Sequence, residues 1–140
     1  MPQEQNYHNH KRVHPLFHFI GAPLALITLI GSVVYLITSF SWVSVLTVLA
    51  SIGLLVTVIL TRTYAAKLQD RIIRGEENFR HYLLTGKPLN PRLTIRQIVA
   101  LRFAGDEQFP ALCEQAVNKS LTPVDIKKAV TQWRGDFYRV

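Results

Sequence analysis

Four histidines lie within the first eighteen residues of the chain, at His8, His10, His14 and His18. Neutral imidazole is a common ligand of zinc, copper, nickel and haem iron. Positions 10, 14 and 18 are four residues apart, so on one helix their side chains would share a face. Pro15 opposes this arrangement, because the residue before a proline disfavours helical backbone. We therefore expect no bound cofactor, and the four histidines remain the only candidate metal ligands.

No nucleophile in the sequence is paired with a base. Cys113 has Glu114 beside it but no histidine in its own predicted helix, and His81 belongs to another helix. A single thiol in a reducing compartment is usually a small core residue. The paired acids at 76–77 and 106–107 are typical of solvated helix faces and helix starts, and no phosphate-binding glycine loop is present. The sequence therefore predicts that the protein is not an enzyme.

Basic residues dominate the charge of the chain, with 16 Lys and Arg against nine Asp and Glu. Basic side chains beside a membrane bind anionic lipid head groups at roughly 1 kcal/mol each. Five such residues flank the apolar stretch at 16–61, and they are Lys11, Arg12, Arg62, Lys67 and Arg71. Nucleic acid is the other class of anionic partner, but no recognised motif is present and acids are interspersed. We expect membrane lipids as partners of these residues, and no nucleic acid.

Residues 16–61 contain no Asp, Glu, Lys or Arg in 46 consecutive positions. A helix that crosses a hydrocarbon core of about 30 Å needs roughly 20 apolar residues, and a single chain segment inside lipid must be helical unless it closes into a barrel. The stretch therefore predicts two transmembrane helices, at about 16–38 and 42–61, joined by an uncharged turn. The first is too long for the apolar part of a signal peptide, which spans about 7–15 residues, and a second span follows at once.

Small residues recur at helical spacing along both predicted spans. Helices in lipid associate through such small faces, which would pack the hairpin against itself, another copy or a larger partner. These residues are Gly21, Ala25, Thr28 and Ser32 in the first span and Ser44, Thr47, Ala50, Ser51, Gly53 and Thr57 in the second.

Basic residues also set the expected orientation. They precede the first span and follow the second, whereas the turn at 39–41 carries none. Because Lys and Arg are enriched on the cytoplasmic side, we expect a multi-pass protein of the cell (inner) membrane with both termini in the cytoplasm.

Residues 62–140 are of a different composition, with fourteen basic and eight acidic residues. The second helix is predicted to continue to the stop at Gly86, Lys87 and Pro88, with an apolar face and a face of charged residues. Gly75 lies inside this helix, where it costs about 1 kcal/mol relative to alanine and could mark a bend.

Three shorter helices are predicted to follow the long one. Asn90 or Thr94 would cap the first, through residue 104, and Asp106 the second, to about residue 118. Thr122 would cap the third, which is expected to run from residue 124 to about Trp133. We expect Trp133 to lie on the apolar face of this last helix and to pack inward.

Several local sequences, spread over essentially the whole chain, are similar to those of a bacterial family of small two-pass membrane proteins. They are QNYHNH at 5–10 with HPL at 14–16, TRTY at 61–64, QDRIIR at 69–74, RHYLL at 80–84, LRFA at 101–104, and IKK at 126–128 with WR at 133–134. The chain thus resembles domain-of-unknown-function family 6526. The resemblance implies two spans and a helical cytoplasmic tail, and it implies no activity and no functional residues. Gly75 departs from the family pattern, in which a larger aliphatic residue is expected.

Together these patterns predict an all-α protein with a two-span transmembrane helical hairpin, a long second helix and a small three-helix cytoplasmic domain. The expected divisions are a His-rich cytoplasmic segment at 1–15, the hairpin at 16–61 and a basic helical cytoplasmic domain at 62–140. The expected function is that of a non-enzymatic, membrane-anchored interaction module that binds a membrane protein partner or forms a homo-oligomer. Two alternatives stay open: a small accessory subunit of a larger membrane complex, and a haem- or metal-binding membrane protein that uses the N-terminal histidines.

Overall fold

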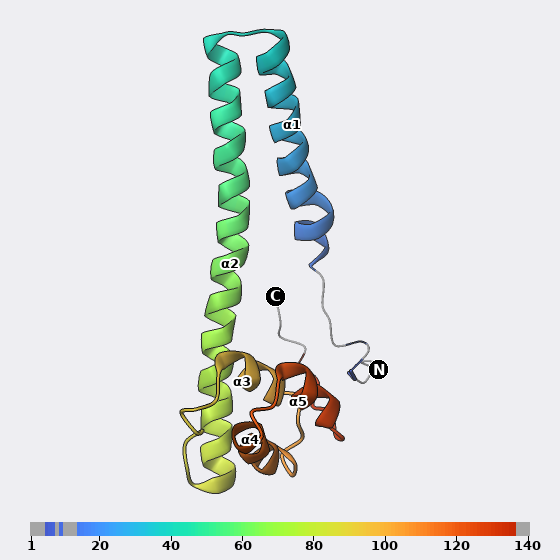
Figure 1. Cartoon of the computed structure of the whole chain (residues 1–140), viewed down its shortest axis with the longest axis vertical. Coiled ribbons are helices and arrows are strands. Elements are labelled where there is room, and N and C mark those ends of the chain that lie inside the picture. Colours follow the sequence, from blue (N-terminus) through green and yellow to red (C-terminus); the bar gives the residue numbers. More distant parts are fainter. Residues whose placement is uncertain (1–4, 8, 10–13, 137–140) are drawn as a thin grey trace. The chain divides into compact units, whose positions relative to one another are not determined.

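The computed structural model describes residues 5–7, 9 and 14–136 of the chain (Figure 1). It divides into two compact units with a boundary between residues 66 and 67. We call the described residues 14–66 the hairpin unit, and residues 5–7, 9 and 67–136 the domain unit. The described residues form helices and no strands, which confirms the predicted all-α class. The elements are a π-helix η1 (Leu16–Gly21) and the α-helices α1 (Ala22–Thr38), α2 (Trp42–Thr85), α3 (Ile95–Leu101), α4 (Phe109–Asn118) and α5 (Pro123–Ala129).

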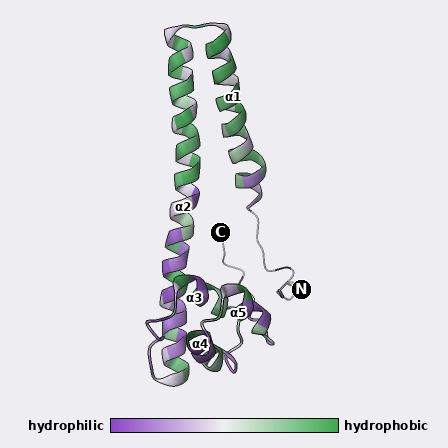
Figure 2. Ribbon diagram, in the orientation of Figure 1, coloured by the Kyte–Doolittle hydropathy of each residue, from purple (hydrophilic) through white to green (hydrophobic). Residues whose placement is uncertain are grey.

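Two helices are long and apolar enough to cross a membrane, by length and composition. The first is the continuous helix Leu16–Thr38, made of η1 and α1, and the second is α2. Within the hairpin unit, α1 and the first part of α2 run in opposite directions on either side of the short turn at residues 39–41 (Figure 1). Figure 2 shows that both are coloured as hydrophobic over most of their length. The predicted limits of the first span agree with the helix bounds.

The first helix begins in the π register. The backbone N–H of Ala22 donates to the carbonyl of Phe17, five residues earlier. Pro23 follows directly, within the first two positions of α1. A proline has no N–H to donate, so the helix lacks one backbone hydrogen bond at the point where it passes from the π to the α register.

The long helix α2 ends where the sequence predicts. Gly86 adopts a φ of +71°, a left-handed conformation that glycine enters without steric cost, and its N–H donates to the carbonyl of Tyr82 at 2.8 Å. Pro88 lies two residues farther on and cannot continue a helix. The helix runs through Gly75 without interruption.

The starts of two of the three short helices follow the predicted caps, whereas the start of α4 does not. Thr94 caps α3 in a reciprocal arrangement with Gln97, and Thr122 caps α5 in the same way with Asp125. The alternative cap, Asn90, is wrong, because its side chain accepts from the backbone of Arg92 in a turn.

The predicted cap of α4 at Asp106 is also wrong. The helix begins at Phe109 with Gln108 in the cap position and no side-chain cap bond. The Asp106 carboxylate instead pairs with Arg80, and an ion pair with a buried guanidinium replaces the cap.

Trp133 does pack inward, but from a non-helical segment, since α5 ends at Ala129 rather than near residue 133. Its backbone forms an isolated antiparallel bridge with Ala104. Its ring lies 5.1 Å from that of Phe103, centroid to centroid, and contacts the core of the domain unit. That core is formed by α3, α4, α5 and the loop before α3, with Leu101, Phe109, Leu112 and Ile126 as its largest fully buried members.

Candidate functional site

Of the four N-terminal histidines, the structure describes His14 and His18, and His8 and His10 lie outside the described residues. The ring Nδ1 of His18 lies 3.0 Å from the carbonyl oxygen of His14, and the backbone N–H of His18 donates to the same oxygen at 3.1 Å. These two histidines therefore form the first turn of the helix that starts at Leu16. Within residues 5–7, 9 and 14–136 there is no group of three or more His, Cys, Asp or Glu side chains that could hold a metal ion.

Cys113 is a core residue of α4. Its side chain is buried among the apolar residues of the domain unit. Burial, with a smaller contribution from the nearby Glu77, raises the pKa of the thiol to about 12. Because the thiolate is the nucleophile, this cysteine is a protonated and unreactive thiol at neutral pH.

His81 is a structural residue at the end of α2. Its Nδ1 lies 2.7 Å from the carbonyl oxygen of Lys87, which follows the helix. Its ring also packs edge to face with that of Phe109, with centroids 6.0 Å apart. Nδ1 also lies 3.2 Å from the Thr85 hydroxyl, which donates to the carbonyl of His81, so these contacts hold the end of α2 in place.

The most distinctive polar feature is an ionic cluster in which Glu77 and Arg80 are buried, whereas the side chains of Asp106 and Arg134 are 68% and 54% exposed. Arg80 is 9% exposed and Glu77 5%. The Arg80 guanidinium contacts the Glu77 carboxylate at 3.0 Å and the Asp106 carboxylate at 2.6 Å, and it donates to the carbonyl of Ala104 at 2.7 Å. Arg134 lies 3.7 Å from the second oxygen of Glu77. The cluster joins α2 to the segment after α3 and to the residues that follow α5.

The electrostatics of this cluster are set mainly by burial. Desolvation raises the pKa of Glu77, and the hydrogen bond and the charge of Arg80 oppose that rise. The Arg80 guanidinium also lies 4.3 Å above the ring of Phe109, a cation–π contact that covers its apolar face. These contacts link α2 to the rest of the domain unit.

The sequence analysis missed this cluster, because it placed the charged face of α2 in solvent. The structure differs in part: Glu77 and Arg80 are buried and Arg71 and Arg74 are exposed. The apolar residues Leu68, Ile72, Phe79 and Leu83 are between 53% and 68% exposed. The three-residue spacing of Glu77 and Arg80, which lets them pair on one helix, is the signal that could have indicated the cluster.

A second buried arginine, Arg102, links the two ends of the domain unit. Its guanidinium pairs with the Asp136 carboxylate at 2.8 Å and lies 4.2 Å above the ring of Phe103. The backbone N–H of Asp136 donates to the side-chain oxygen of Gln5 at 2.9 Å, and the Gln5 amide donates to the carbonyl of Asp136 at 3.2 Å. The N-terminal segment therefore contacts the C-terminal part of the domain unit.

Of the five residues predicted to contact anionic lipids, the structure describes Arg62, Lys67 and Arg71. Lys11 and Arg12 lie outside the described residues. In the hairpin unit, Arg62 lies 5.7 Å from the ring centre of Phe17. Lys67 and Arg71 are exposed residues of α2 in the domain unit.

Part of the small-residue surface of the hairpin unit is covered by the hairpin itself. Ala25, Ser32, Ser44 and Ser51 are buried, and the hydroxyls of Ser32 and Ser51 lie 2.8 Å apart in a hydrogen bond between α1 and α2. The second group of small residues in α2 is exposed, and it consists of Ala50, Gly53 and Thr57. The hairpin unit therefore has one internal face of small residues and one that it leaves open.

Comparison with known proteins places the whole chain in one family. The model of a family of unknown function, DUF6526, matches residues 1–140. No curated protein and no solved structure matches the chain. Since the match covers every residue, the chain belongs to the DUF6526 family.

Proposed function

We propose that this chain is an integral membrane protein whose helical hairpin anchors the domain unit at the cytoplasmic face of the cell (inner) membrane. The observation that supports this best is the uncovered apolar surface of the two long helices. Only 6% and 11% of their most apolar segments are buried, unlike the core helix of a soluble protein. At 1.5 Å per residue, the 23 residues of Leu16–Thr38 span about 34 Å, close to the thickness of a hydrocarbon core.

The charges at the ends of these helices support the orientation. Lys11 and Arg12 precede the first helix, Arg62 and Lys67 follow the apolar part of α2, and the turn carries no charge. By the positive-inside rule both termini lie in the cytoplasm. The same basic residues would contact anionic lipid head groups there.

The activity that we propose is non-enzymatic: the protein associates with a second copy of itself through α2. In the domain unit, the exposed apolar residues Leu68, Ile72, Phe79 and Leu83 follow one another at steps of four, seven and four, which places them on one helix face. In the hairpin unit, the exposed small residues of α2 offer a face of the kind that helices in lipid use for close approach. A second α2 would supply a matching surface to both, which favours a homodimer.

Cysteine crosslinking in membranes tests this proposal. In a Cys113→Ala background, Ile72→Cys or Phe79→Cys should form a crosslinked species of twice the 16.0-kDa chain mass. Lys119→Cys, an exposed position on the end of α4, is the matched control and should stay monomeric.

The rival function, an accessory subunit of a larger membrane complex, predicts a different product. Crosslinks from Ile72→Cys would then join the chain to a protein of another mass, and the doubled species would be absent. That result would overturn the homodimer while leaving the membrane anchor intact.

A further inference from the structure

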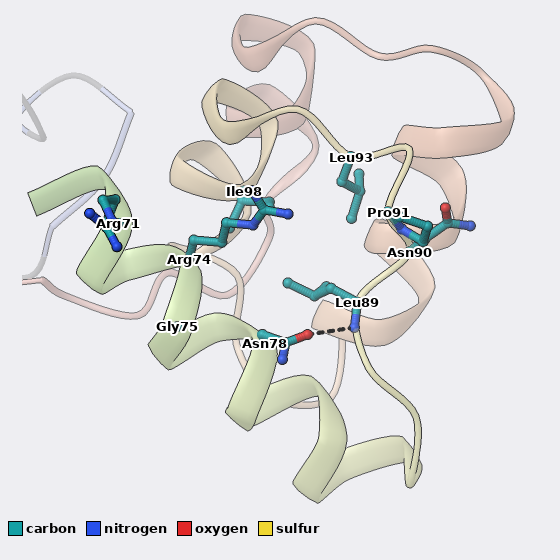
Figure 3. Close-up of a pocket in the computed structure, with 9 residues that line it drawn as sticks. All are labelled: Arg71, Arg74, Gly75, Asn78, Leu89, Asn90, Pro91, Leu93 and Ile98. Carbon is teal, nitrogen blue, oxygen red and sulfur yellow. Dashed lines mark hydrogen bonds between the residues drawn. The ribbon is translucent and has the colours of Figure 1, made fainter. Parts of the chain in front are cut away.

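A cavity of about 430 Å³ lies in the domain unit, between α2 and the segment that leads from α2 into α3 (Figure 3). This volume is within the range of about 300–1,000 Å³ that is typical of small-molecule sites, which combine apolar walls with a few polar groups. The α2 wall consists of Arg71, Arg74, Gly75 and Asn78. None of the residues that line the cavity is acidic.

Arg71 and Arg74 give the cavity its charge. They are three residues apart in α2 and therefore share a helix face. Both are exposed, and neither side chain makes a hydrogen bond, ion pair or ring contact with the part of the chain that the structure describes. Arg80 and Arg102, by contrast, are buried and paired with carboxylates. Two arginines of the domain unit are thus paired with carboxylates, and two others lie exposed beside the cavity.

The opposite wall is apolar and held in place. Leu89, Leu93 and Ile98 are at most 9% exposed, and Leu89 and Leu93 point into the space between the segment and α2 (Figure 3). The side-chain oxygen of Asn78 accepts from the backbone N–H of Leu89 at 2.9 Å, which ties this wall to α2. The cavity therefore joins a fixed apolar surface to a pair of guanidinium groups.

Gly75 lies in the middle of the α2 wall, and neither backbone nor packing requires a glycine there. The residue is inside a regular helix, where glycine costs about 1 kcal/mol relative to alanine. A Cβ added at this position would meet no atom within 4 Å. The effect of the missing side chain is to keep space open at the cavity.

We propose that this cavity binds a phosphate ester that carries an apolar group. A guanidinium pairs with two oxygens of an anion at once. A carboxylate has two oxygens, enough for one arginine, whereas a phosphate monoester has three terminal oxygens and nearly two negative charges, enough for both. The apolar part of the ester would lie against Leu89 and Leu93. This site is independent of the homodimer proposed above, and its ligand is either a soluble phosphate ester or the head group of a membrane lipid.

Calorimetric titration of the full chain in phosphatidylcholine nanodiscs tests the site, with hexyl phosphate as the probe and empty nanodiscs subtracted. Hexyl phosphate should bind at least about tenfold more tightly than inorganic phosphate, since only the ester buries apolar surface. The double variant Arg71→Gln/Arg74→Gln should weaken binding by about tenfold or more, because each charge-assisted pair is lost.

Two further variants distinguish binding in the cavity from a general attraction of the anion to the basic residues of the protein. Arg92→Gln/Arg96→Gln removes the same charge from exposed residues that do not line the cavity, and it should leave the affinity within about twofold. Gly75→Leu keeps every charge and improves helix propensity, and it should abolish binding because the leucine fills the cavity.

Nanodiscs that contain phosphatidic acid identify the source of the ligand. If they prevent wild-type protein from binding hexyl phosphate, the site takes a lipid head group; if binding is unchanged, the site takes a soluble ester. Equal affinities for hexyl phosphate and inorganic phosphate would overturn the proposal. So would unchanged binding in Gly75→Leu, or equal losses in the two double-arginine variants.

Discussion

At the level of single residues, the domain unit depends on charges that the fold has removed from water. The Arg80 guanidinium is held by two carboxylates, a backbone carbonyl and the face of Phe109. Taking such an ion out of water costs several kcal/mol unless all its donors are paired. Glu77 and Arg80 are the buried members, so the loss of either one leaves the other buried without the ion pair that they share.

Replacement of Arg80 by methionine should destabilise the domain unit by about 3–5 kcal/mol, because Glu77 then loses its main buried partner. Arg96→Met is the matched control, since Arg96 is exposed, and its effect should be within about 0.5 kcal/mol. Hydrogen exchange of α3 and α4 amides in the detergent-solubilised chain measures both. Equal protection of these amides in the two variants would show that the cluster does not hold the domain together.

Glu77 should also make the stability of the domain unit depend on pH. Burial raises its pKa in the folded state above the ordinary value of 4.5. As pH falls from neutral, the folded state therefore takes up this proton before the unfolded state does, and the contribution of Glu77 to stability increases. That contribution is complete below pH 4.5 and is lost as pH rises through the folded-state pKa.

The difference in unfolding free energy between wild type and Glu77→Gln isolates this effect, since all other groups titrate in both. As pH falls from 7 to 4.5, the free energy of unfolding of the wild type should increase relative to that of Glu77→Gln. A difference that stays constant, or that changes in the opposite direction, would contradict a raised pKa.

At the level of elements, the sequence was most informative where a single local mechanism decides the structure. The stop of α2 depends on a left-handed glycine and a nearby proline, and the starts of α3 and α5 depend on Thr94 and Thr122. These signals lie within a few residues of the feature they control. They can therefore be recognised without knowledge of what lies elsewhere in the fold.

The errors arose where distant segments compete for the same residue. Asp106 is a reasonable helix cap by sequence, but an arginine 26 positions earlier takes its carboxylate. The apolar face of α2 in the domain unit is exposed because α3, α4 and α5 supply their own core. The cavity beside Arg71 and Arg74 likewise depends on where the segment after α2 turns back, which helix periodicity does not specify.

The prediction for Trp133 was correct in part: the residue packs inward, but it lies in a non-helical segment. Replacement by alanine removes its contact with Phe103. Since the indole is only partly buried, the cost should be about 2–3 kcal/mol, below the 3–5 typical of a fully buried aromatic residue. Trp42→Ala, at a position that is 82% exposed in the hairpin unit, is the control.

Limited proteolysis of membranes that contain each variant measures this effect. Trp133→Ala should make residues beyond about 90 protease-sensitive while the hairpin stays inserted, and Trp42→Ala should not. Full protection in Trp133→Ala would mean that the ring contributes little to packing and is available to a partner.

At the level of the whole molecule, two kinds of surface indicate two environments. The hairpin unit keeps large apolar side chains such as Phe40, Trp42 and Ile37 more than 75% exposed, which water does not favour. The domain unit instead has a buried apolar core and carries most of the charged residues of the chain. A lipid environment for the first and water for the second accounts for both compositions.

The most direct test of this account is the accessibility of single cysteines to a membrane-impermeant maleimide in intact spheroplasts. In a Cys113→Ala background, Phe40→Cys reports on the turn of the hairpin and Lys119→Cys on the domain unit; both positions are exposed. A two-span protein with cytoplasmic termini predicts that Phe40→Cys is labelled in intact spheroplasts and Lys119→Cys only after lysis. Labelling of Lys119→Cys before lysis, or of Phe40→Cys only after it, would contradict the account.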